Sequence, residues 1–308
     1  MSERRMTVRA TVAKLALKGV RGLGQRRNVQ ILSLLVLNSF FLSPLRPVCF
    51  PALNCYMCPM AVFACPVGVA VQFATVAAFP LFAVGVVGLT SAVFGRFACG
   101  WLCPFGLVQE WLHRIPLPKF SVPRRLGYAR YAVLVIFVVG VPLYLRAKEH
   151  PLYFCSWCPV GTLEAAVPAG IAKATAGLKP TSAFVAASPT HFQLAVQEFA
   201  VSPMMWVKLG VLGAVLAAAA MMKRPFCRVV CPLGAAFSIF GRFSWLQLKV
   251  NKERCRTCEA CRRLCPVDLE PSEDAGSAEC ITCLECWTEL RCGVVSASVS
   301  LSDRKGNG

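Results

Sequence analysis

Two runs of closely spaced cysteines near the carboxyl end of the chain constrain its fold more than any other feature. The first run reads C-x2-C-x2-C-x3-C-P, and the second reads C-x2-C-x2-C-x5-C. The cysteines are Cys255, Cys258, Cys261 and Cys265 in the first run, and Cys280, Cys283, Cys286 and Cys292 in the second. In runs of this kind three thiolates bind one [4Fe–4S] cluster, and the fourth ligand comes from the other run. The pattern therefore predicts a small two-cluster, ferredoxin-like α+β module in residues 244–308.

Crossed ligation assigns each of the eight cysteines to one of two clusters. The expected ligand sets are Cys255, Cys258, Cys261 and Cys292 for one cluster, and Cys280, Cys283, Cys286 and Cys265 for the other. The second run departs from the usual pattern, because five residues precede Cys292 and Gly293 stands where proline is usual. Pairs of the form C-x2-C also make four-cysteine zinc sites. Three cysteines at successive x2 spacings, in both runs, favour the cluster over zinc.

The rest of the chain has the composition of a membrane protein. Hydrophobic residues make up 56% of the 308 residues and charged residues only 16%, which is more apolar than a soluble domain. Four stretches are long and apolar enough to cross a hydrocarbon layer of about 30 Å. These stretches are Val29–Leu45, Val67–Phe94, Tyr128–Leu145 and Phe199–Met222. We therefore expect an all-α membrane protein with four transmembrane helices in residues 29–243, followed by the ferredoxin module.

The net charge of +18 is distributed as membrane topology requires, so nucleic acid is not an expected partner. Basic residues gather in the arm of residues 1–28, in the connection after the second stretch, and directly after the fourth. The positive-inside rule places all three regions in the cytoplasm. The chain is thus expected to be a multi-pass protein of the inner (cytoplasmic) membrane, with both termini in the cytoplasm. The arm is either an amphipathic helix on anionic lipid or a topology signal alone.

The membrane domain reads as a duplicated unit with halves at residues 29–115 and 128–243. Each half contains an apolar stretch, a C-x2-C-P element, a second apolar stretch and a C-x3-C-P-x-G element. Self-similarity of this kind indicates internal repeats, and the two halves are expected to be related by pseudo-symmetry. The segment Pro159–Leu178 within the second half is expected to be an interfacial helix, since Glu164 and Lys173 interrupt it.

Topology sorts the repeat cysteines into two sets, because one apolar stretch separates the two elements within each half. The inner set is Cys99, Cys103, Cys227 and Cys231, and the outer set is Cys55, Cys58, Cys155 and Cys158. The inner set is expected to bind a third [4Fe–4S] cluster. The outer set would bind a fourth, or its pairs would form disulfides or exchange thiols.

Two further cysteines leave the outer set open. Cys65 begins a C-P-V-G sequence like that at Cys158, so it is an alternative to Cys55 or Cys58 as a ligand. Alternatively, Cys49, Cys55, Cys58 and Cys65 would hold one cluster by themselves.

These motifs together resemble the NapH/NosR-type membrane polyferredoxin family. The resemblance rests on C-G-W-L-C-P-F-G at 99–106, C-R-V-V-C-P-L-G at 227–234, and the double ferredoxin run, and it covers the chain from Val29 onward. It implies four transmembrane helices and electron transfer between a quinol or cytoplasmic donor and a reductase system outside the membrane. The C-x2-C-P pairs are additions to the NapH pattern, and the amino-terminal flavin domain of NosR members has no counterpart in this sequence.

The sequence supports iron–sulfur chemistry and little else. No C-x2-C-H haem motif, Gly-rich phosphate loop or dinucleotide fingerprint is present. We expect an electron-transfer subunit that relays electrons through several [4Fe–4S] clusters, with membrane lipid and redox proteins as partners and a quinone as a further candidate cofactor. The competing hypotheses are a membrane thiol/disulfide relay that uses the outer pairs, and a redox-linked assembly or sensing factor for a metalloenzyme.

Overall fold

The computed structural model describes most of both halves and part of the ferredoxin module. The described residues are 23–39, 45, 48–55, 58, 61–147, 150–168, 171, 203–242, 244–251, 255, 258, 260–270, 277, 279–289 and 294–299. Several expectations therefore lie wholly or partly outside the described residues, among them residues 1–22 of the arm 1–28, residues 169, 170 and 172–178 of the segment Pro159–Leu178, and the placement of Cys292.

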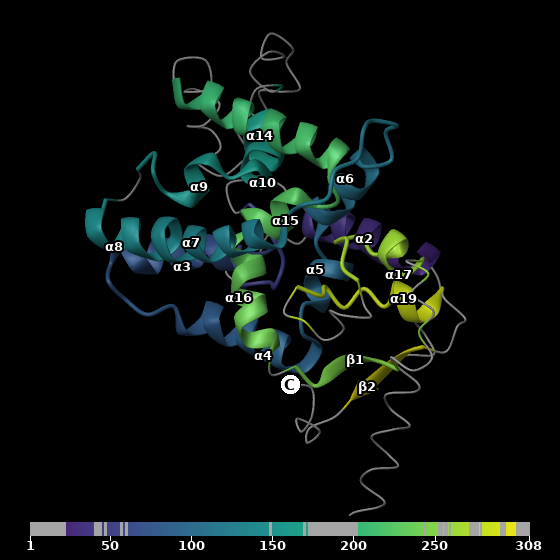
Figure 1. Ribbon diagram of the computed structural model, residues 1–308. Coiled ribbons are helices and arrows are strands. Elements are labelled where there is room, and N and C mark those ends of the chain that lie inside the picture. The colour runs from purple at the N-terminus through teal and green to yellow at the C-terminus, as the bar shows by residue number, and fades with distance from the viewer. Residues whose placement is uncertain are drawn as a thin grey trace, which may run out of the picture.

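The described residues of the first half, with those just before it, form five helices. They are α2 Leu23–Leu37, α3 Pro66–Thr75, α4 Leu81–Phe94, α5 Phe97–Trp101 and α6 Pro104–Leu112 (Figure 1). Helix α2 begins six residues before the expected apolar stretch, so it takes basic residues of the arm into its first turn. One of them, Arg26, is buried. Its burial indicates a structural role beyond that of a topology charge.

The expected second span, Val67–Phe94, is two helices rather than one. Helix α3 ends at Thr75 and α4 begins at Leu81. Ala77 between them has a left-handed backbone with φ 53°, which interrupts a right-handed helix. Pro80 then lacks the backbone N–H that a continuous helix would need, and it stands at the amino-terminal end of α4 instead. Helices α3 and α4 contact each other, so the apolar segment changes direction between them.

The second half repeats this order. Its elements are η2 Arg124–Tyr128, α7 Ala129–Val133, η3 Leu134–Gly140, α8 Val141–Leu145, α9 Phe154–Trp157, α10 Pro159–Gly161, η4 Thr162–Ala166, α14 Pro203–Met221, α15 Pro225–Val229 and α16 Pro232–Gly241. The elements from η2 to α8 form one continuous helical stretch. Its middle part, η3, is π-helical just before Pro142. A π-segment there accommodates the backbone bond that proline cannot make.

The two halves pack against each other through equivalent helices. Helix α4 of the first half contacts α16 of the second, and α14 of the second contacts α6 of the first (Figure 1). Likewise α2 contacts α6, and α7 contacts α16. The same pairing therefore occurs twice with the halves exchanged. One continuous hydrophobic core forms between them, and six of the repeat cysteines, together with Cys65, lie in or against it.

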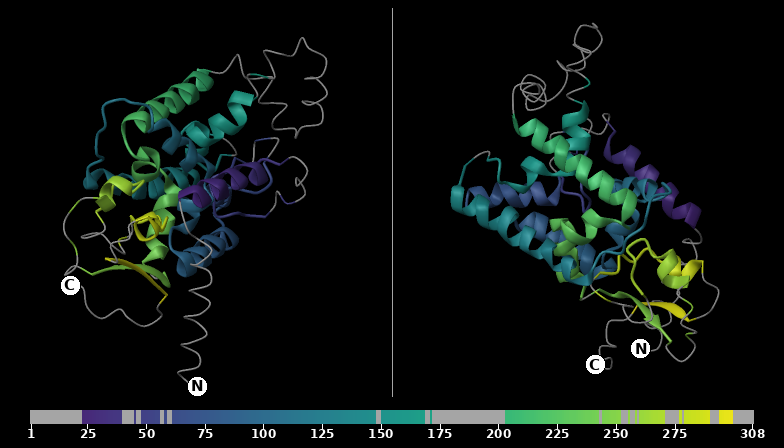
Figure 2. Two further views of the ribbon diagram at one scale, coloured as in Figure 1. Left: turned by 90° about the vertical axis from the view of Figure 1, so that its right-hand side faces the viewer. Right: turned by 45° about the horizontal axis from the view of Figure 1, so that its top comes forward.

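The described part of the carboxyl-terminal module contains two strands and two short helices. They are β1 Leu246–Val250, α17 Ala260–Leu264, α19 Glu285–Thr288 and β2 Val295–Val299. The strands are antiparallel, with Leu246 opposite Val299 and Val250 opposite Val295. Leu248, Leu284, Cys286 and Val295 form a small core beneath the sheet. The module lies at one side of the molecule, to the right of α4 and α16 in Figure 1 and beside α2 in Figure 2. Its ferredoxin-like fold stays a prediction.

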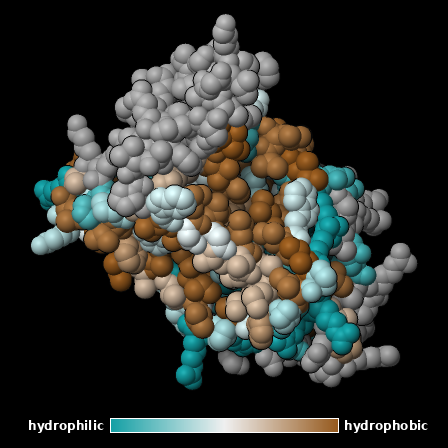
Figure 3. All heavy atoms as spheres, turned by 90° about the horizontal axis from the view of Figure 1, so that it is seen from above, coloured by the Kyte–Doolittle hydropathy of each residue, from teal (hydrophilic) through white to brown (hydrophobic). Residues whose placement is uncertain are grey.

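The surface of the membrane domain is apolar. Large hydrophobic side chains are exposed on several helices, among them Leu35, Leu81, Leu89, Tyr144 and Trp206, and apolar residues cover much of the face seen in Figure 3. Among the described residues, two helices, Arg124–Leu145 and Met204–Met221, are long and apolar enough to cross a membrane. Exposed apolar surface of this extent matches lipid contact. The chain is a mostly helical membrane protein, whereas four transmembrane helices remain a prediction.

Candidate metal centres

Four helices begin with the same Cys-Pro step. They are α3 after Cys65, α6 after Cys103, α10 after Cys158 and α16 after Cys231. Each cysteine is the N-cap residue in an extended conformation, and proline occupies the first helical turn, where its missing N–H costs nothing. In each case glycine follows three residues after the cysteine, and its backbone N–H donates to the thiol sulfur. The bond from Gly234 N to Cys231 Sγ is 3.3 Å long. At each of the four helix starts, the cysteine sulfur therefore accepts a hydrogen bond from a backbone N–H.

The inner cysteines come together at one place, named here the inner site: Cys99, Cys103, Cys227 and Cys231. Burial raises the pKa of Cys103 to about 12, and the neighbouring Cys227 and Cys99 raise it as well. The pKa of Cys231 is raised by burial first and then by Cys227, Cys99 and Cys103. Thiols so placed are unfavourable as free thiolates, and iron binding supplies the charge that makes them favourable.

Two buried arginines cross between the halves at the inner site. Arg96 and Arg224 each stand three residues before the first cysteine of their C-x3-C pair, and their exposed fractions are 4% and 1%. A methyl group added to Gly234 would lie 3.1 Å from Arg96 Nη2, and one added to Gly106 would lie 3.0 Å from Arg224 Cζ. Each guanidinium therefore reaches the Cys-Pro helix of the other half. Four thiolates around a cluster form a net anion, and these two cations offset its charge.

From the sequence, both arginines are expected only to mark the cytoplasmic side of the membrane. The signal that would have found them is their position in the repeat, since R-x2-C-x3-C-P-x-G occurs in both halves. A basic residue that only sets membrane topology need not stand at a fixed distance from a cysteine in the sequence, whereas a residue that pairs with the cysteine thiolate must.

One side chain breaks the symmetry of the inner site. Gln109 of α6 is fully buried, and its Nε2 donates to Cys227 Sγ over 3.2 Å. Six residues after Cys231, the equivalent position in the other half is Phe237, which has no donor. A hydrogen bond to a ligand sulfur stabilises the reduced cluster and raises its reduction potential.

Replacing this donor should therefore change the potential of the inner-site cluster. We expect Gln109→Leu to lower it by on the order of 50 mV, because the sulfur loses one hydrogen bond. The measurement is a potentiometric titration followed by electron paramagnetic resonance. Gln30→Leu is the matched control, since Gln30 is also fully buried but donates to the backbone carbonyl of Gly100. An unchanged potential in Gln109→Leu would show that this bond does not tune the site.

The ferredoxin module brings together four cysteines that crossed ligation assigns to one cluster: Cys265, Cys280, Cys283 and Cys286. Cys265 acts electrostatically on each of the other three, and burial raises the pKa of Cys280 to about 11. Cys261 of the other expected set also lies near Cys286. The structure describes Cys255 and Cys258 as half-buried and exposed, and their joint arrangement with Cys292 stays a prediction.

The inner site adjoins this ferredoxin site. Cys99 packs against the small core that contains Ile281 and Cys283. Gly100, the next residue, comes so close that an added methyl group would lie 2.6 Å from Ile281 O and 3.5 Å from Cys283 Cα. Trp101 Nε1 then donates to Thr282 O over 3.3 Å. Only glycine permits this approach of the two backbones, and it leaves little protein between the two sets of thiols.

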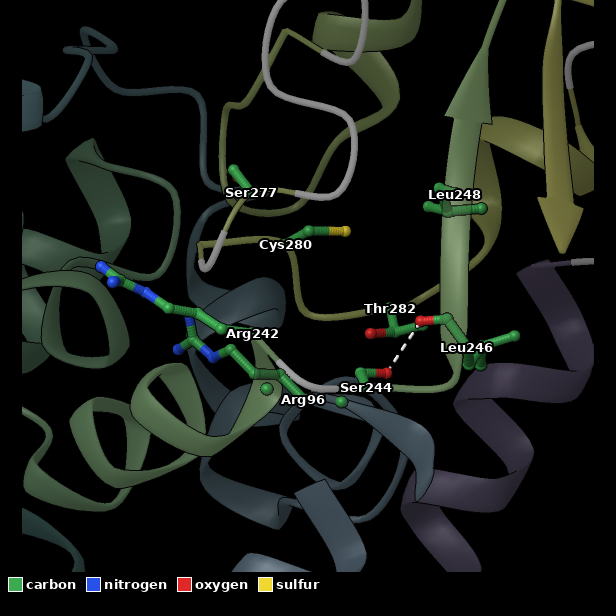
Figure 4. Close-up of a pocket in the computed structure, with 10 residues that line it drawn as sticks. Arg96, Arg242, Ser244, Leu246, Leu248, Ser277, Cys280 and Thr282 are labelled. Carbon is green, nitrogen blue, oxygen red and sulfur yellow. Dashed lines mark hydrogen bonds between the residues drawn. The ribbon is translucent and has the colours of Figure 1, made fainter. Parts of the chain in front are cut away.

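Ion pairs hold the module at this place. Arg26 of α2 bonds to Glu285 of the module and to Glu110 of α6, and Arg224 Nη2 lies 2.6 Å from Glu110 Oε1. On the other side Arg96 Nη1 donates to Glu279 O over 3.1 Å. Figure 4 shows this side, where Arg96 and Cys280 line a cavity of about 50 Å³ between the module and the membrane domain. The contacts link the membrane domain to the loop that carries the ferredoxin cysteines.

The structure groups the outer cysteines differently from the expected set. Cys55, Cys65, Cys155 and Cys158 line one cavity of about 40 Å³. Cys58 is buried, with 4% of its surface exposed, but it does not line this cavity. Cys49 lies beside Cys65. Burial raises the pKa of Cys49 to about 11, and the nearby Cys65 contributes a smaller part of this increase. Cys65 therefore lies at this cavity, at the position that the C-x2-C spacing predicts for Cys58.

The separation of the thiols bears on what these sites can hold. Among the described residues, no three His, Cys, Asp or Glu side chains converge closely enough for a single metal ion. A zinc ion would draw four sulfurs to about 2.3 Å from one point. A [4Fe–4S] cube spaces its four ligands around a larger core. Thiols that interact without converging on one point fit the larger group.

A family model gives an independent line of comparison. The model described as a 4Fe-4S binding domain matches residues 75–123 and 203–253. Each match lies mostly in one half and contains one C-x3-C-P-x-G element. The duplication that the sequence indicates is therefore also a duplication of this domain.

The chain is also similar to several known proteins. An uncharacterized protein of Methanocaldococcus jannaschii is 28% identical over 71% of this chain and 79% of its own length. The regulatory protein NosR of Stutzerimonas stutzeri is 28% identical over 61% of this chain, a stretch that covers 22% of NosR. The ferredoxin-type protein NapH of Haemophilus influenzae is 24% identical over 68% of this chain and 64% of its own length. No solved structure matches the chain.

Proposed function

The chain belongs to the NapH/NosR-type family of 4Fe–4S proteins, and we propose that it relays electrons through several [4Fe–4S] clusters within the membrane. Its partners are redox proteins. The donor is a cytoplasmic protein or a quinol, and the acceptor is a partner in the membrane or the periplasm. In this proposal the chain is an electron-transfer subunit rather than an enzyme that acts alone.

The contact between the inner site and the ferredoxin site is the observation that carries this proposal. Gly100 lies against the backbone of Ile281 and Cys283, and Cys99 packs into the same small core as Cys265 and Cys280. A redox sensor or a storage site has no need for two adjoining sets of cluster ligands. A relay does, because electrons must pass from one centre to the next.

The ligand roles follow from the two groupings. Cys99, Cys103, Cys227 and Cys231 would hold one cluster, and Cys265, Cys280, Cys283 and Cys286 would hold another. A third cluster would take Cys255, Cys258, Cys261 and Cys292. A bound [4Fe–4S] cluster supplies one-electron oxidation and reduction.

The remaining side chains shape the surroundings of these sulfurs. Arg96 and Arg224 offset negative charge at the inner site. Gln109 stabilises one sulfur by a hydrogen bond, and the buried packing around the cysteines excludes water. Arg26 and Glu285 keep the ferredoxin site in contact with the inner site.

The proposed membrane arrangement follows the charges. Four apolar segments would lie in the membrane: α2, the α3–α4 pair, the helix Arg124–Leu145 and α14. Residues 1–28 and the module of residues 244–308 would face the cytoplasm, since the basic residues gather beside them. The protein would then be a multi-pass protein of the inner membrane with both termini in the cytoplasm.

Electron flow through reconstituted vesicles tests the proposal. Vesicles would contain trapped ferricyanide, and dithionite would be added outside. We expect the trapped ferricyanide to be reduced faster with the wild-type protein than in protein-free vesicles. Vesicles with Cys99→Ser/Cys227→Ser should show only the protein-free rate, since the inner site loses two ligands. Equal rates for wild type and variant would rule out a relay through the inner site.

A further inference from the structure

The membrane domain contains a second cluster of cysteines, named here the distal site: Cys55, Cys65, Cys155 and Cys158. Helices α9 and α10, at which Cys155 and Cys158 stand, lie on the opposite side of α15 from α17 and α19 in Figure 1. We propose that Cys55, Cys65, Cys155 and Cys158 form this site and bind a [4Fe–4S] cluster, with Cys65 as a ligand in place of Cys58. The inference rests on the proposed function, because it assigns a further centre of the same chemistry to the same protein.

The first argument is that the four cysteine side chains share one cavity. All four line the same cavity. Cys65 and Cys55 both lie near enough to Cys155 to act on it electrostatically, and Cys155 and Cys65 act in the same way on Cys158. A methyl group added to Gly161 would lie 3.3 Å from Cys55 Sγ. The four thiols, contributed by three segments of the chain, thus lie around one cavity in the core.

Equivalence with the inner site is the second argument. Cys65 and Cys158 each cap a helix that begins with proline, as Cys103 and Cys231 do at the inner site. Their sulfurs accept from the backbone N–H groups of Gly68 and Gly161, in the same geometry as Cys231 and Gly234. Each site therefore combines one Cys-Pro helix from each half with one further cysteine from each half. Cys58, by contrast, lies within a turn, where its N–H donates to Cys55 O over 2.9 Å.

The surroundings of the distal site are largely apolar and exclude water. Tyr153 and Phe154 beside it are buried, with exposed fractions of 3% and 1%. Glu164 is the charged side chain found here, and it accepts a hydrogen bond from Cys55 N over 2.6 Å. That bond fixes the loop that carries Cys55. Glu164 is thereby a positioning residue for the ligand.

One hydrophobic core connects the distal site with the inner site. Cys65, Cys155 and Cys158 pack against the same core that contains Cys103 and Cys231. In addition, the residues that follow Cys65 and Cys231 line one apolar cavity of about 510 Å³ between α3, α4, η3 and α16. The two sites are therefore neighbours within the membrane domain, and a cluster at the distal site would extend the series of centres away from the ferredoxin module.

Two single substitutions test the assignment in the full-length protein. Iron and acid-labile sulfide per chain would be measured after anaerobic purification, together with electron paramagnetic resonance of the reduced sample. We expect Cys65→Ser to lose about four irons per chain relative to wild type, and Cys155→Ser to lose the same number. Cys58→Ser is the matched control, because Cys58 is a buried cysteine of the same loop that does not line the cavity, and this variant should keep the wild-type iron content.

The contrary outcomes are distinct from one another. Wild-type iron in Cys65→Ser would overturn the inference, as expected if the distal cysteines form disulfides. Loss of about four irons in Cys58→Ser but not in Cys65→Ser would return the site to the C-x2-C pair. The resonance of the ferredoxin clusters reports whether each variant is folded. The variant Cys99→Ser/Cys227→Ser examines the inner site separately, so a failure of the proposed function would be seen there and not in Cys65→Ser.

Discussion

Arg26→Leu is expected to destabilise the protein by about 3–5 kcal/mol, because it leaves buried carboxylates without their cation. Only 3% of the Arg26 side chain is exposed, and the exposed fraction of its partner Glu285 is 5%. Glu110 would retain Arg224, whereas Glu285 would lose the cation that offsets the cost of its burial. Burial already raises the pKa of Glu285 against the opposing effect of Arg26. The midpoint of thermal unfolding should fall by on the order of 10 °C.

The measurement is thermal unfolding in detergent, followed by the loss of the visible absorbance of the clusters. Arg27→Leu is the control, since Arg27 lies about 100° around the same helix and is half-buried. The double variant Arg26→Leu/Glu285→Leu should be more stable than Arg26→Leu, because it removes the unpaired carboxylate as well. If Arg26→Leu unfolds at the same temperature as Arg27→Leu, the ion pairs do not hold the module in place.

The apolar stretches of the sequence predict a mostly helical protein, which the structure confirms, but not the details of its helices. Hydropathy treats Val67–Phe94 as one segment because nearly every residue in it is apolar. The break between α3 and α4 depends on the left-handed backbone of Ala77 and on Pro80. An average over about 20 residues, the length of a span, does not register two positions of that kind.

The loop before α3 explains why spacing alone could not decide between Cys58 and Cys65. Cys49 pairs with Ala64 in an isolated parallel bridge, and the rings of Phe50 and Phe63 stack with centroids 5.0 Å apart. These contacts close the loop on itself and bring Cys65 back to Cys55. A short-range motif such as C-x2-C registers only local neighbours, whereas this approach is set by contacts across about 15 residues of loop, whose closure adds little cost for its length.

Burial of charge was the other feature that the sequence concealed. Arg26, Arg96 and Arg224 all have exposed fractions of 4% or less, although a basic residue beside an apolar helix is ordinarily a solvated topology signal. Their burial follows from partners that the fold supplies, namely Glu110, Glu285 and the sulfurs of the inner site. Composition records how many such charges exist, but only the tertiary structure pairs them.

The second large effect is expected at the inner site itself. Cys99→Ser/Cys227→Ser should remove about four irons and four sulfides per chain, because a [4Fe–4S] cluster rarely survives the loss of two of its four thiolates. Cys99 packs against a small core of the ferredoxin module, and Cys227 lies in the hydrophobic core of the membrane domain. The control is Cys49→Ser, a buried cysteine outside both sites, which should keep the iron content of the wild type.

The most direct test of the account is therefore the iron and acid-labile sulfide content of the anaerobically purified wild-type protein and of Cys99→Ser/Cys227→Ser. The account predicts about sixteen irons per chain in the wild type if the distal site is also filled, and about four fewer in the variant. Electron paramagnetic resonance of the reduced samples should lose one cluster signal while those of the ferredoxin module remain. About eight irons per chain in both proteins would contradict the account, because the clusters would then be confined to the ferredoxin module.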